Sequence, residues 1–302
     1  MKRNYCIISD GSCDLPDDLV REKEIGVVHF LVSFDGDQYK KEGVEIDLNE
    51  FYQRMVDEPR TYPMTAAPSP QDFYALFEPR AKEGQDILCV CISTKLSSSL
   101  QSAQIARDML KETYPGVRVA LLNSLACTLM QGACVLEACR LRDAGCTLDE
   151  TVQRMQALIK TGRILFTVGN LDYLYHGGRI GKVTSIAGAL LNVKPLITLQ
   201  DGEIHSSGIR RGRKNSLLGV VDLLISYLKE SRCTPDDCTI LIGYCHDAGE
   251  AESFRALTME RLRKVFGEVA PLRLCRIGAT IGVHAGPHSI GYGVIRRSDR
   301  LG

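Results

Sequence analysis

Short apolar runs alternate with amphipathic segments along the first half of the chain, and this alternation restricts the fold more than any other feature. The runs YCIIS, ILCVCIS and VRVALLNS begin at residues 5, 87 and 117. Residues 100–110 follow the second run and carry apolar side chains three or four positions apart, as on one face of a helix. Strands that alternate with helices build a parallel sheet with both faces covered. The pattern therefore predicts an α/β/α domain.

After Gly162 the pattern changes to that of an α+β domain. Two apolar runs joined by Asp201-Gly202 predict a β-hairpin, because Asp-Gly suits its tight turn. A helix, a strand, a second helix and a further strand are expected over residues 217–228, 238–246, 250–266 and 272–278. We therefore expect an N-terminal α/β domain over residues 1–162 and a C-terminal α+β domain over residues 163–302, in close contact.

Charge and hydropathy argue against two classes of partner. Lys plus Arg and Asp plus Glu both total 37, so the formal net charge is zero and gives no support to nucleic acid as a partner. The apolar run near the start soon meets Asp10 and does not resemble a secretory signal. No apolar run approaches the ~18 residues that a membrane span needs. We expect a soluble, cytoplasmic protein without stable membrane insertion.

The chain has twelve cysteines, which in a secreted protein would suggest disulfides. Cys6, Cys89, Cys91 and Cys245 lie inside apolar runs, where cysteine behaves as a small hydrophobic residue. The sequence contains no CxxC pair of the kind that holds zinc. We expect reduced thiols, no metal site and no cofactor.

Two polar loops are candidates for ligand binding. The proline-rich segment 61–70, TYPMTAAPSP, displays hydroxyls such as that of Thr65 from a stiff backbone, although it can equally be a surface turn. In STKLSSSLQSAQ, which starts at residue 93, several serines crowd a helix start, where free amides favour a carboxylate or phosphate. Ordinary N-capping by Ser97 explains part of this pattern.

Two basic segments follow in the second half. GGRIGK at 177–182 is one residue short of a phosphate-loop spacing, and Val183 stands where that motif needs Ser or Thr. It is instead a glycine turn that displays Arg179, and arginine suits a carboxylate or phosphate. The segment RRGRK at 210–214 contains Arg211 and is either a solvated helix start or a contact for a partner.

His284 stands in the glycine-rich stretch IGATIGVHAGPHSIGYGV, which begins at residue 277. The glycines permit close approach of a ligand or a neighbouring segment. From these residues alone a structural and a functional histidine are equally open. A serine hydrolase would usually present its nucleophile in a GxSxG turn, which the sequence lacks.

These motifs occur together, in this order, in one known family. The segments ISDGSCDLP, TAAPSP, ISTKLSSSLQSA, LDYLYHGGRI, RRGRK and GVHAGP resemble the DegV family of bacterial proteins, which includes the fatty-acid-binding subunits of fatty acid kinase. The resemblance extends from Ile7 to about Val294. It implies a two-domain DegV-like fold that encloses one long-chain fatty acid and presents its carboxyl group to a separate fatty acid kinase, in phospholipid metabolism. It implies that the chain is a carrier and not an enzyme.

The resemblance also implies roles for five residues. Thr65, Ser97 and His284 match residues that lie at the carboxylate end of the family's ligand. Arg179 and Arg211 match arginines near the head group or on the kinase-facing surface. Apolar segments such as SIAGALLNV, from residue 185, are then expected to line the acyl chain.

The sequence departs from the family pattern at three positions. Ala66 replaces a serine, Lys95 stands in a segment that has lost two glycines, and His288 replaces a glycine. A different acyl chain or another carboxylate ligand is therefore open. Two other classes of function are also open, namely a hydrolase or phosphotransferase in its own right and an interaction protein without a ligand.

Overall fold

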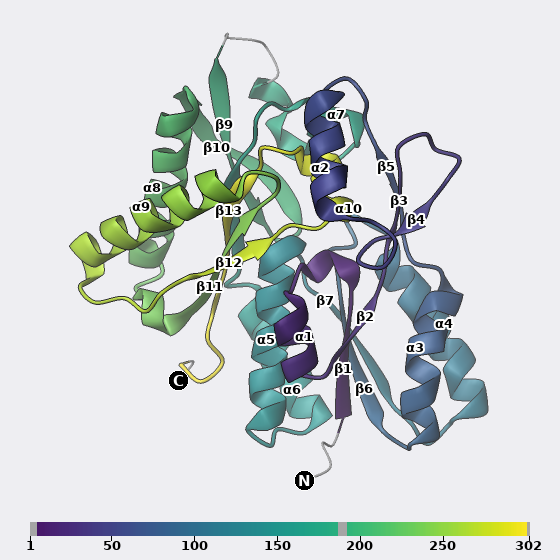
Figure 1. The fold of residues 1–302 in the computed structure, drawn as a ribbon. Helices are drawn as coiled ribbons and strands as arrows, with labels where there is room; N and C mark the ends of the chain where they lie inside the picture. Colours follow the sequence, from purple (N-terminus) through teal and green to yellow (C-terminus); the bar gives the residue numbers. More distant parts are fainter. Residues whose placement is uncertain (1–4, 187–191, 301–302) are drawn as a thin grey trace.

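The computed structural model describes residues 5–186 and 192–300 and contains two large sheets and one small sheet (Figure 1). The segment SIAGALLNV at 185–193, expected to line an acyl chain, lies in large part outside the described residues.

The N-terminal sheet is parallel, with strand order β2-β1-β6-β7. Helices α3 and α4 pack on one face, and α5 and α6 pack on the other, so the predicted α/β/α architecture is confirmed. The bounds are β1 Tyr5–Asp10, η1 Gly11–Cys13, α1 Asp17–Glu22, β2 Ile25–Val28, α3 Pro70–Lys82, β6 Asp86–Cys91, α4 Ser99–Thr113, β7 Val119–Asn123, α5 Thr128–Asp143 and α6 Leu148–Ile159.

The C-terminal sheet is mixed, with strand order β10-β9-β8-β13-β11-β12, and its only parallel pair among the described strands is β11 with β12. The hairpin at Asp201-Gly202 is confirmed as the turn between β9 and β10. The bounds are β8 Arg163–Thr167, α7 Asp172–His176, η2 Gly181–Ile186, β9 Val193–Gln200, β10 Glu203–Arg211, α8 Arg213–Glu230, η3 Pro235–Asp237, β11 Cys238–Tyr244, α9 Ala248–Phe266, β12 Arg273–Arg276, α10 Ala279–Ala285 and β13 Ile290–Arg296.

A small antiparallel sheet, which the sequence pattern does not predict, stands beside α10. It has the order β4-β3-β5 and is accompanied by the helix α2. Its bounds are β3 Leu31–Ser33, β4 Lys40–Lys41, α2 Leu48–Asp57 and β5 Met64–Ala66. The expectation that Thr65 stands on a proline-stiffened loop is therefore wrong. Thr65 lies on strand β5 and pairs with Val32 of β3.

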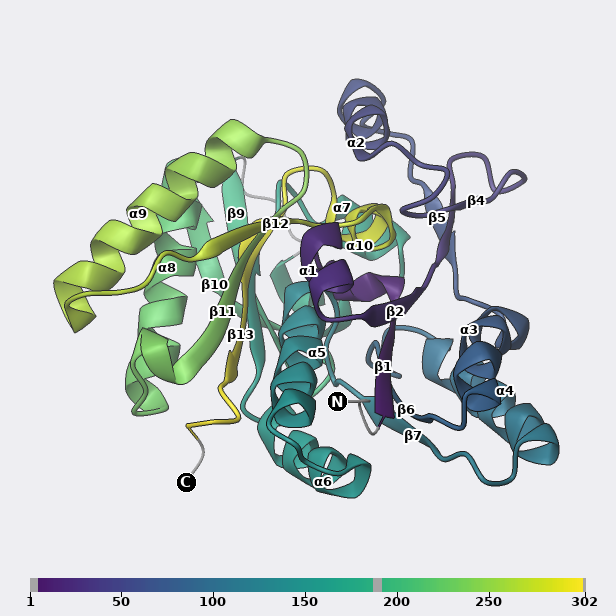
Figure 2. The same cartoon turned by 60° about the horizontal axis from the view of Figure 1, so that its bottom comes forward.

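Helix α5 joins the two halves. It contacts η1, β1 and β6 on one side and β8, β11 and β13 on the other, and Figure 2 shows it between β1 and β13. Thirteen of its sixteen residues are buried, as expected for a helix enclosed on every side. Its side chains share one apolar cluster with both sheets, so the expected close contact of the halves is confirmed. The assignment of residues 1–162 and 163–302 to separate domains stays a prediction.

Glycines on the C-terminal sheet allow α5 to approach closely. A Cβ on Gly293 of β13 would overlap the backbone of Leu129 and Met130 in the first turn of α5. A Cβ on Gly243 of β11 would lie 2.7 Å from a methyl carbon of Leu129. The contact between helix and sheet therefore depends on bare backbone at these positions.

Substitution of Gly293 tests this contact. We expect Gly293→Ala to lower the free energy of unfolding by about 1–3 kcal/mol, because helix or strand must shift to admit a methyl group. Gly116→Ala is the matched control, since no atom lies within 4 Å of the Cβ position there. Denaturant unfolding of both variants measures the effect, and equal stability of the two would contradict the close contact.

Candidate ligand cavity

A cavity of about 270 Å³ lies between the two halves of the chain. Its walls come from the carboxyl end of the N-terminal sheet, the first turn of α5, the inner face of the C-terminal sheet, and α10. Most of the lining is apolar, with contributions from Ile92, Leu129, Ile164, Phe166, Leu199 and Tyr292. A polar group interrupts this apolar lining and is formed by Thr65, Ser97, Arg179 and His284. The structure thus brings four of the five predicted site residues to one cavity.

Thr65 and His284 are in direct contact. Thr65 Oγ1 lies 3.1 Å from Nε2 of His284, which stands in the last turn of α10. The other ring nitrogen, Nδ1, is buried without a hydrogen-bond partner among the described residues. It faces Gly177, where a Cβ would overlap it. The glycine needed for close approach thus belongs to the GGRI turn and lies far from the histidine in sequence.

Arg179 is held by the loop that follows β6. Its Nε and Nη2 donate to the carbonyl oxygen of Leu96 at 3.1 and 3.0 Å, and its Nη1 donates to Gly177 at 2.7 Å. Leu96 precedes Ser97, so these bonds hold the guanidinium beside the polar group of the cavity. An arginine charge on one side of an apolar cavity favours an anionic group there.

The serines of the STKLSSS loop have different partners. Ser97 Oγ accepts from Ser99 N at 3.2 Å and also lines the cavity. The expected N-capping by Ser97 is wrong, because the N-cap of α4 is Ser98 and makes no side-chain cap hydrogen bond. The Ser99 hydroxyl donates to Asp10 Oδ2 at 2.7 Å. Asp10 ends β1, so the segment that follows β1 meets the STKLSSS loop at the carboxyl ends of neighbouring parallel strands, where such sheets place ligand sites.

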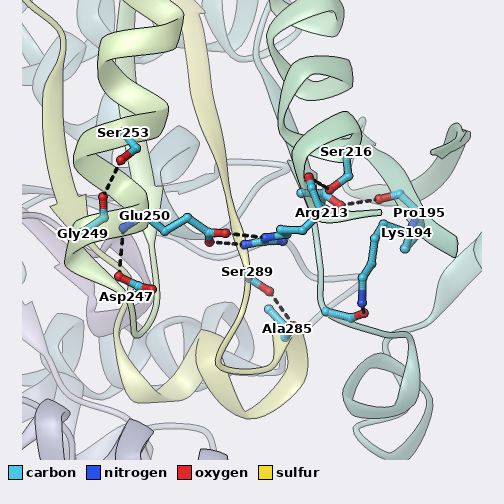
Figure 3. A network of polar contacts seen from close by, with 12 residues as sticks. Lys194, Pro195, Arg213, Ser216, Asp247, Gly249, Glu250, Ser253, Ala285 and Ser289 are labelled. Atoms are coloured by element: carbon cyan, nitrogen blue, oxygen red, sulfur yellow. Dashed lines mark hydrogen bonds and ion pairs between the residues drawn. The ribbon is translucent and has the colours of Figure 1, made fainter. Parts of the chain in front are cut away.

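Arg211 lies away from this group. It is exposed at the end of β10 and is not among the described residues that line the cavity. The next arginine of RRGRK, Arg213, begins α8 and forms a two-bond ion pair with Glu250 of α9, at 2.8 and 2.5 Å (Figure 3). Part of this basic segment therefore ties two helices together.

None of the three departures from the family pattern is among the described residues that line the cavity. Ala66 pairs with Leu31 in the small sheet. Lys95 forms an ion pair with Glu203 at 3.0 Å. His288 is exposed and packs beside Gly169. They therefore do not change the lining of the described cavity directly.

The cysteines are placed as the apolar runs predict. All twelve are free thiols, and Cys6, Cys89, Cys91 and Cys245 are buried. Within residues 5–186 and 192–300, no cluster of three or more potential metal ligands is present. No helix of the same residues is long and apolar enough to cross a membrane.

Sequence reasoning did not single out Thr128 or Thr280, which are among the hydroxyl residues that line the cavity. Thr128 begins α5 with a positive φ of 43°, and Thr280 lies in the first turn of α10. Thr128 lies in none of the segments singled out above, and Thr280 lies in the glycine-rich stretch around His284 without having been recognised there. Their place on the cavity wall follows from the helix contacts and could not be read from local pattern.

His284 is uncharged at neutral pH. Burial, and to a smaller degree the charge of Arg179, lowers the pKa of His284 from 6.5 to about 4. A neutral imidazole can donate one hydrogen bond and accept another. Together with the hydroxyls of Thr65 and Ser97, it can satisfy the oxygens of a carboxylate without a full opposing charge.

The lowered pKa predicts a pH dependence of stability. Between pH 6.5 and 4 the unfolded chain binds a proton at His284 that the folded chain excludes, so stability falls as pH falls. Relative to His284→Gln, the ligand-free wild type should lose up to about 3 kcal/mol across this window. Chemical unfolding at several pH values measures the difference. His205→Gln, at a side chain that is 39% exposed, keeps His284 and is the control, so it should lose stability across this window as the wild type does.

Comparison with known proteins identifies the family of the chain. The model of the DegV family of uncharacterised proteins matches residues 4–297. A DegV domain-containing protein of Caldanaerobacter subterraneus subsp. tengcongensis is 33% identical over 285 residues, which cover 94% of this chain and 96% of that protein.

Two solved structures show the same fold. One is the crystal structure of a protein from Eubacterium ventriosum described as binding stearic acid, with a TM-score of 0.91, 35% identity, and coverage of 98% of this chain and 100% of that chain. The other is a Thermus thermophilus DegV family protein described by its fatty acid binding, with a TM-score of 0.85, 28% identity, and coverage of 97% and 99%. From its sequence and its fold alike, this chain belongs to the DegV family.

Proposed function

We propose that this chain binds a long-chain fatty acid in the cavity and presents its carboxyl group to a separate fatty acid kinase subunit. The observation that carries the proposal is a largely apolar cavity whose polar group is formed by Thr65, Ser97 and His284 beside the charge of Arg179. The relatives from Eubacterium ventriosum and Thermus thermophilus, described as fatty acid binders, support it.

The two parts of the cavity have different tasks. The apolar walls supply most of the affinity, at roughly 0.8 kcal/mol for each methylene removed from water. The polar group supplies orientation. Nε2 of a neutral His284 can donate to Thr65 Oγ1, and the Thr65 hydroxyl can then donate its own hydrogen to a carboxylate oxygen. No covalent step is assigned to this chain.

The alternatives are less well supported. A hydrolase would need Ser97 and His284 as a nucleophile and base pair, yet His284 Nε2 contacts Thr65, and the Ser97 hydroxyl contacts Ser99 N. A phosphotransferase would need several free donors in the basic turn, whereas each of the three nitrogens of Arg179 already donates one N–H to a backbone carbonyl. An interaction protein without a ligand leaves the cavity unexplained.

Denaturing extraction and mass spectrometry of the purified chain test the proposal. We expect about one fatty acid per chain in the wild type. In Thr65→Ala/Ser97→Ala we expect affinity for added fatty acid to fall at least about tenfold, because hydrogen bonds to a charged group are lost. Thr94→Ala, in the same loop but exposed and outside the cavity lining, is the control.

The result that would contradict fatty acid binding is an empty wild type that also takes up no added fatty acid. Ester hydrolysis by the chain alone, abolished by Ser97→Ala, would favour the enzyme alternative. Because Ser97 Oγ also accepts from Ser99 N, the unfolding of each variant is measured first, with a loss of about 0.5–1.5 kcal/mol expected.

Arg211 provides a separate test of kinase presentation. Its side chain is exposed and has no hydrogen bond or ion pair with the described residues, so it is available to a partner. We expect Arg211→Glu to reduce acyl phosphate formation by the kinase while fatty acid retention stays unchanged. Lys264→Glu, which reverses the charge of an exposed residue on the outer helix α9, is the control. Equal acyl phosphate formation by wild type and Arg211→Glu would overturn this role.

A further inference from the structure

Two buried carboxyl groups, those of Asp14 and Glu42, lie at the start of α10. Asp14 is 9% exposed and Glu42 is 6% exposed. Asp14 Oδ1 accepts from Gly278 N at 3.0 Å, and Glu42 Oε1 accepts from Thr280 N at 3.0 Å. The Thr280 hydroxyl also donates to Glu42 Oε2. Two acids that are distant in sequence thus satisfy amides at the beginning of the helix that carries His284.

The two carboxyl groups face the same backbone position. A Cβ on Gly278 would lie 2.7 Å from Asp14 Oδ1 and would overlap Glu42 Oε1. Neither acid forms an ion pair with a described Lys or Arg. The titratable and charged groups around the pair are Asp10, Cys13, Tyr52, Cys127, Cys245 and Cys275, with His29 and Lys41 on the side of the Glu42 backbone.

Two buried carboxylates that face the same backbone position and have no ion pair with a described cation repel each other, which favours a proton on one of them. Burial, and then the neighbouring Glu42, raises the pKa of Asp14 well above 3.8, and burial raises the pKa of Glu42. Both oxygens of Glu42 accept hydrogen bonds from Thr280, which favours its charged form.

Asp14 is the better site for the proton. Its Oδ2 and the adjacent Thr128 Oγ1 are both buried and have no hydrogen-bond partner among the described residues. Asp14 accepts one hydrogen bond, from Gly278 N, whereas Glu42 accepts two from Thr280, and a protonated Oδ2 could donate to Thr128 Oγ1. Thr128 and Thr280 both line the cavity, so the two acids lie directly behind its wall.

We propose that Asp14 and Glu42 share one proton, held on Asp14, and that this singly charged pair is a positioning device for His284. The pair fixes the start of α10, and His284 follows Thr280 by four residues, or about one helical turn. Only the step from His284 to a bound fatty acid rests on the proposed function. The proton itself can be tested on the ligand-free chain.

Infrared spectroscopy and pH-dependent unfolding test the shared proton. At neutral pH we expect the C=O band of a protonated carboxylic acid in the wild type, lost in Asp14→Asn. From pH 3.8 upward the folded chain keeps a proton that the unfolded chain releases, so wild-type stability should fall relative to Asp14→Asn as pH rises. Asp47→Asn, at an exposed acid that caps α2, is the control and should keep the band. An unchanged band in Asp14→Asn would overturn the proposal.

Binding of the fluorescent fatty acid cis-parinaric acid tests the positioning role. Glu42→Ala leaves Thr280 N without an acceptor, and we expect about tenfold weaker binding and a shifted His284 signal in NMR spectra. Glu42→Gln keeps an acceptor oxygen, so its binding affinity and its His284 signal should both be close to those of the wild type. If folded Glu42→Ala binds cis-parinaric acid as the wild type does and its His284 signal is unchanged, the positioning role is wrong.

A wild type that does not bind cis-parinaric acid would contradict the proposed function alone. The infrared band, the pH dependence of unfolding and the His284 signal would still decide the role of the acid pair, because none of them needs a ligand.

Discussion

The burial of α5 between two sheets is the contact on which the rest of the structure depends. A helix enclosed on all sides needs partners for its polar groups. Gln131 near its start donates to Ser9 and Asp10, at 3.1 and 2.8 Å, and accepts from Ser12. Glu137 near its end accepts from Ser298 N and from the Thr239 hydroxyl. One turn of α5 thus fixes the end of β1 and the segment after it, and another holds the C-terminal sheet.

The cavity follows from this arrangement. The first turn of α5 forms part of its wall, and the polar loops after β1 and β6 are brought to the same edge because their strands are neighbours in a parallel sheet. The C-terminal sheet closes the space from the other side. A ligand in this cavity would contact both halves, so binding and the packing of the halves are linked.

The sequence pattern predicted the helices and strands whose own residues determine them. Periodicity and turn chemistry located α4, α9 and the hairpin at Asp201-Gly202, because each buries its own apolar face. The small sheet around Thr65 and the helix α10 were not predicted. β5 is three residues long, and the first amides of α10 are satisfied by Asp14 and Glu42, which are more than 200 residues away in sequence. Interactions of that range leave no local signal. The resemblance to a family located Thr65, Ser97, Arg179 and His284 on the cavity, but it gave no indication of Thr128 or Thr280.

Strand β10 of the hairpin forms the outer edge of the C-terminal sheet, where a second copy of the chain could pair with it. Its first half is covered by η2, whereas its second half carries the exposed Ile209, Arg210 and Arg211. An open edge with an exposed apolar residue invites a second copy to add a strand. The register shift between Ser206 and Ile209 interrupts regular pairing, and the two arginines add repulsion between copies. The exposed arginines and the register shift therefore disfavour edge-to-edge pairing of two copies of the chain.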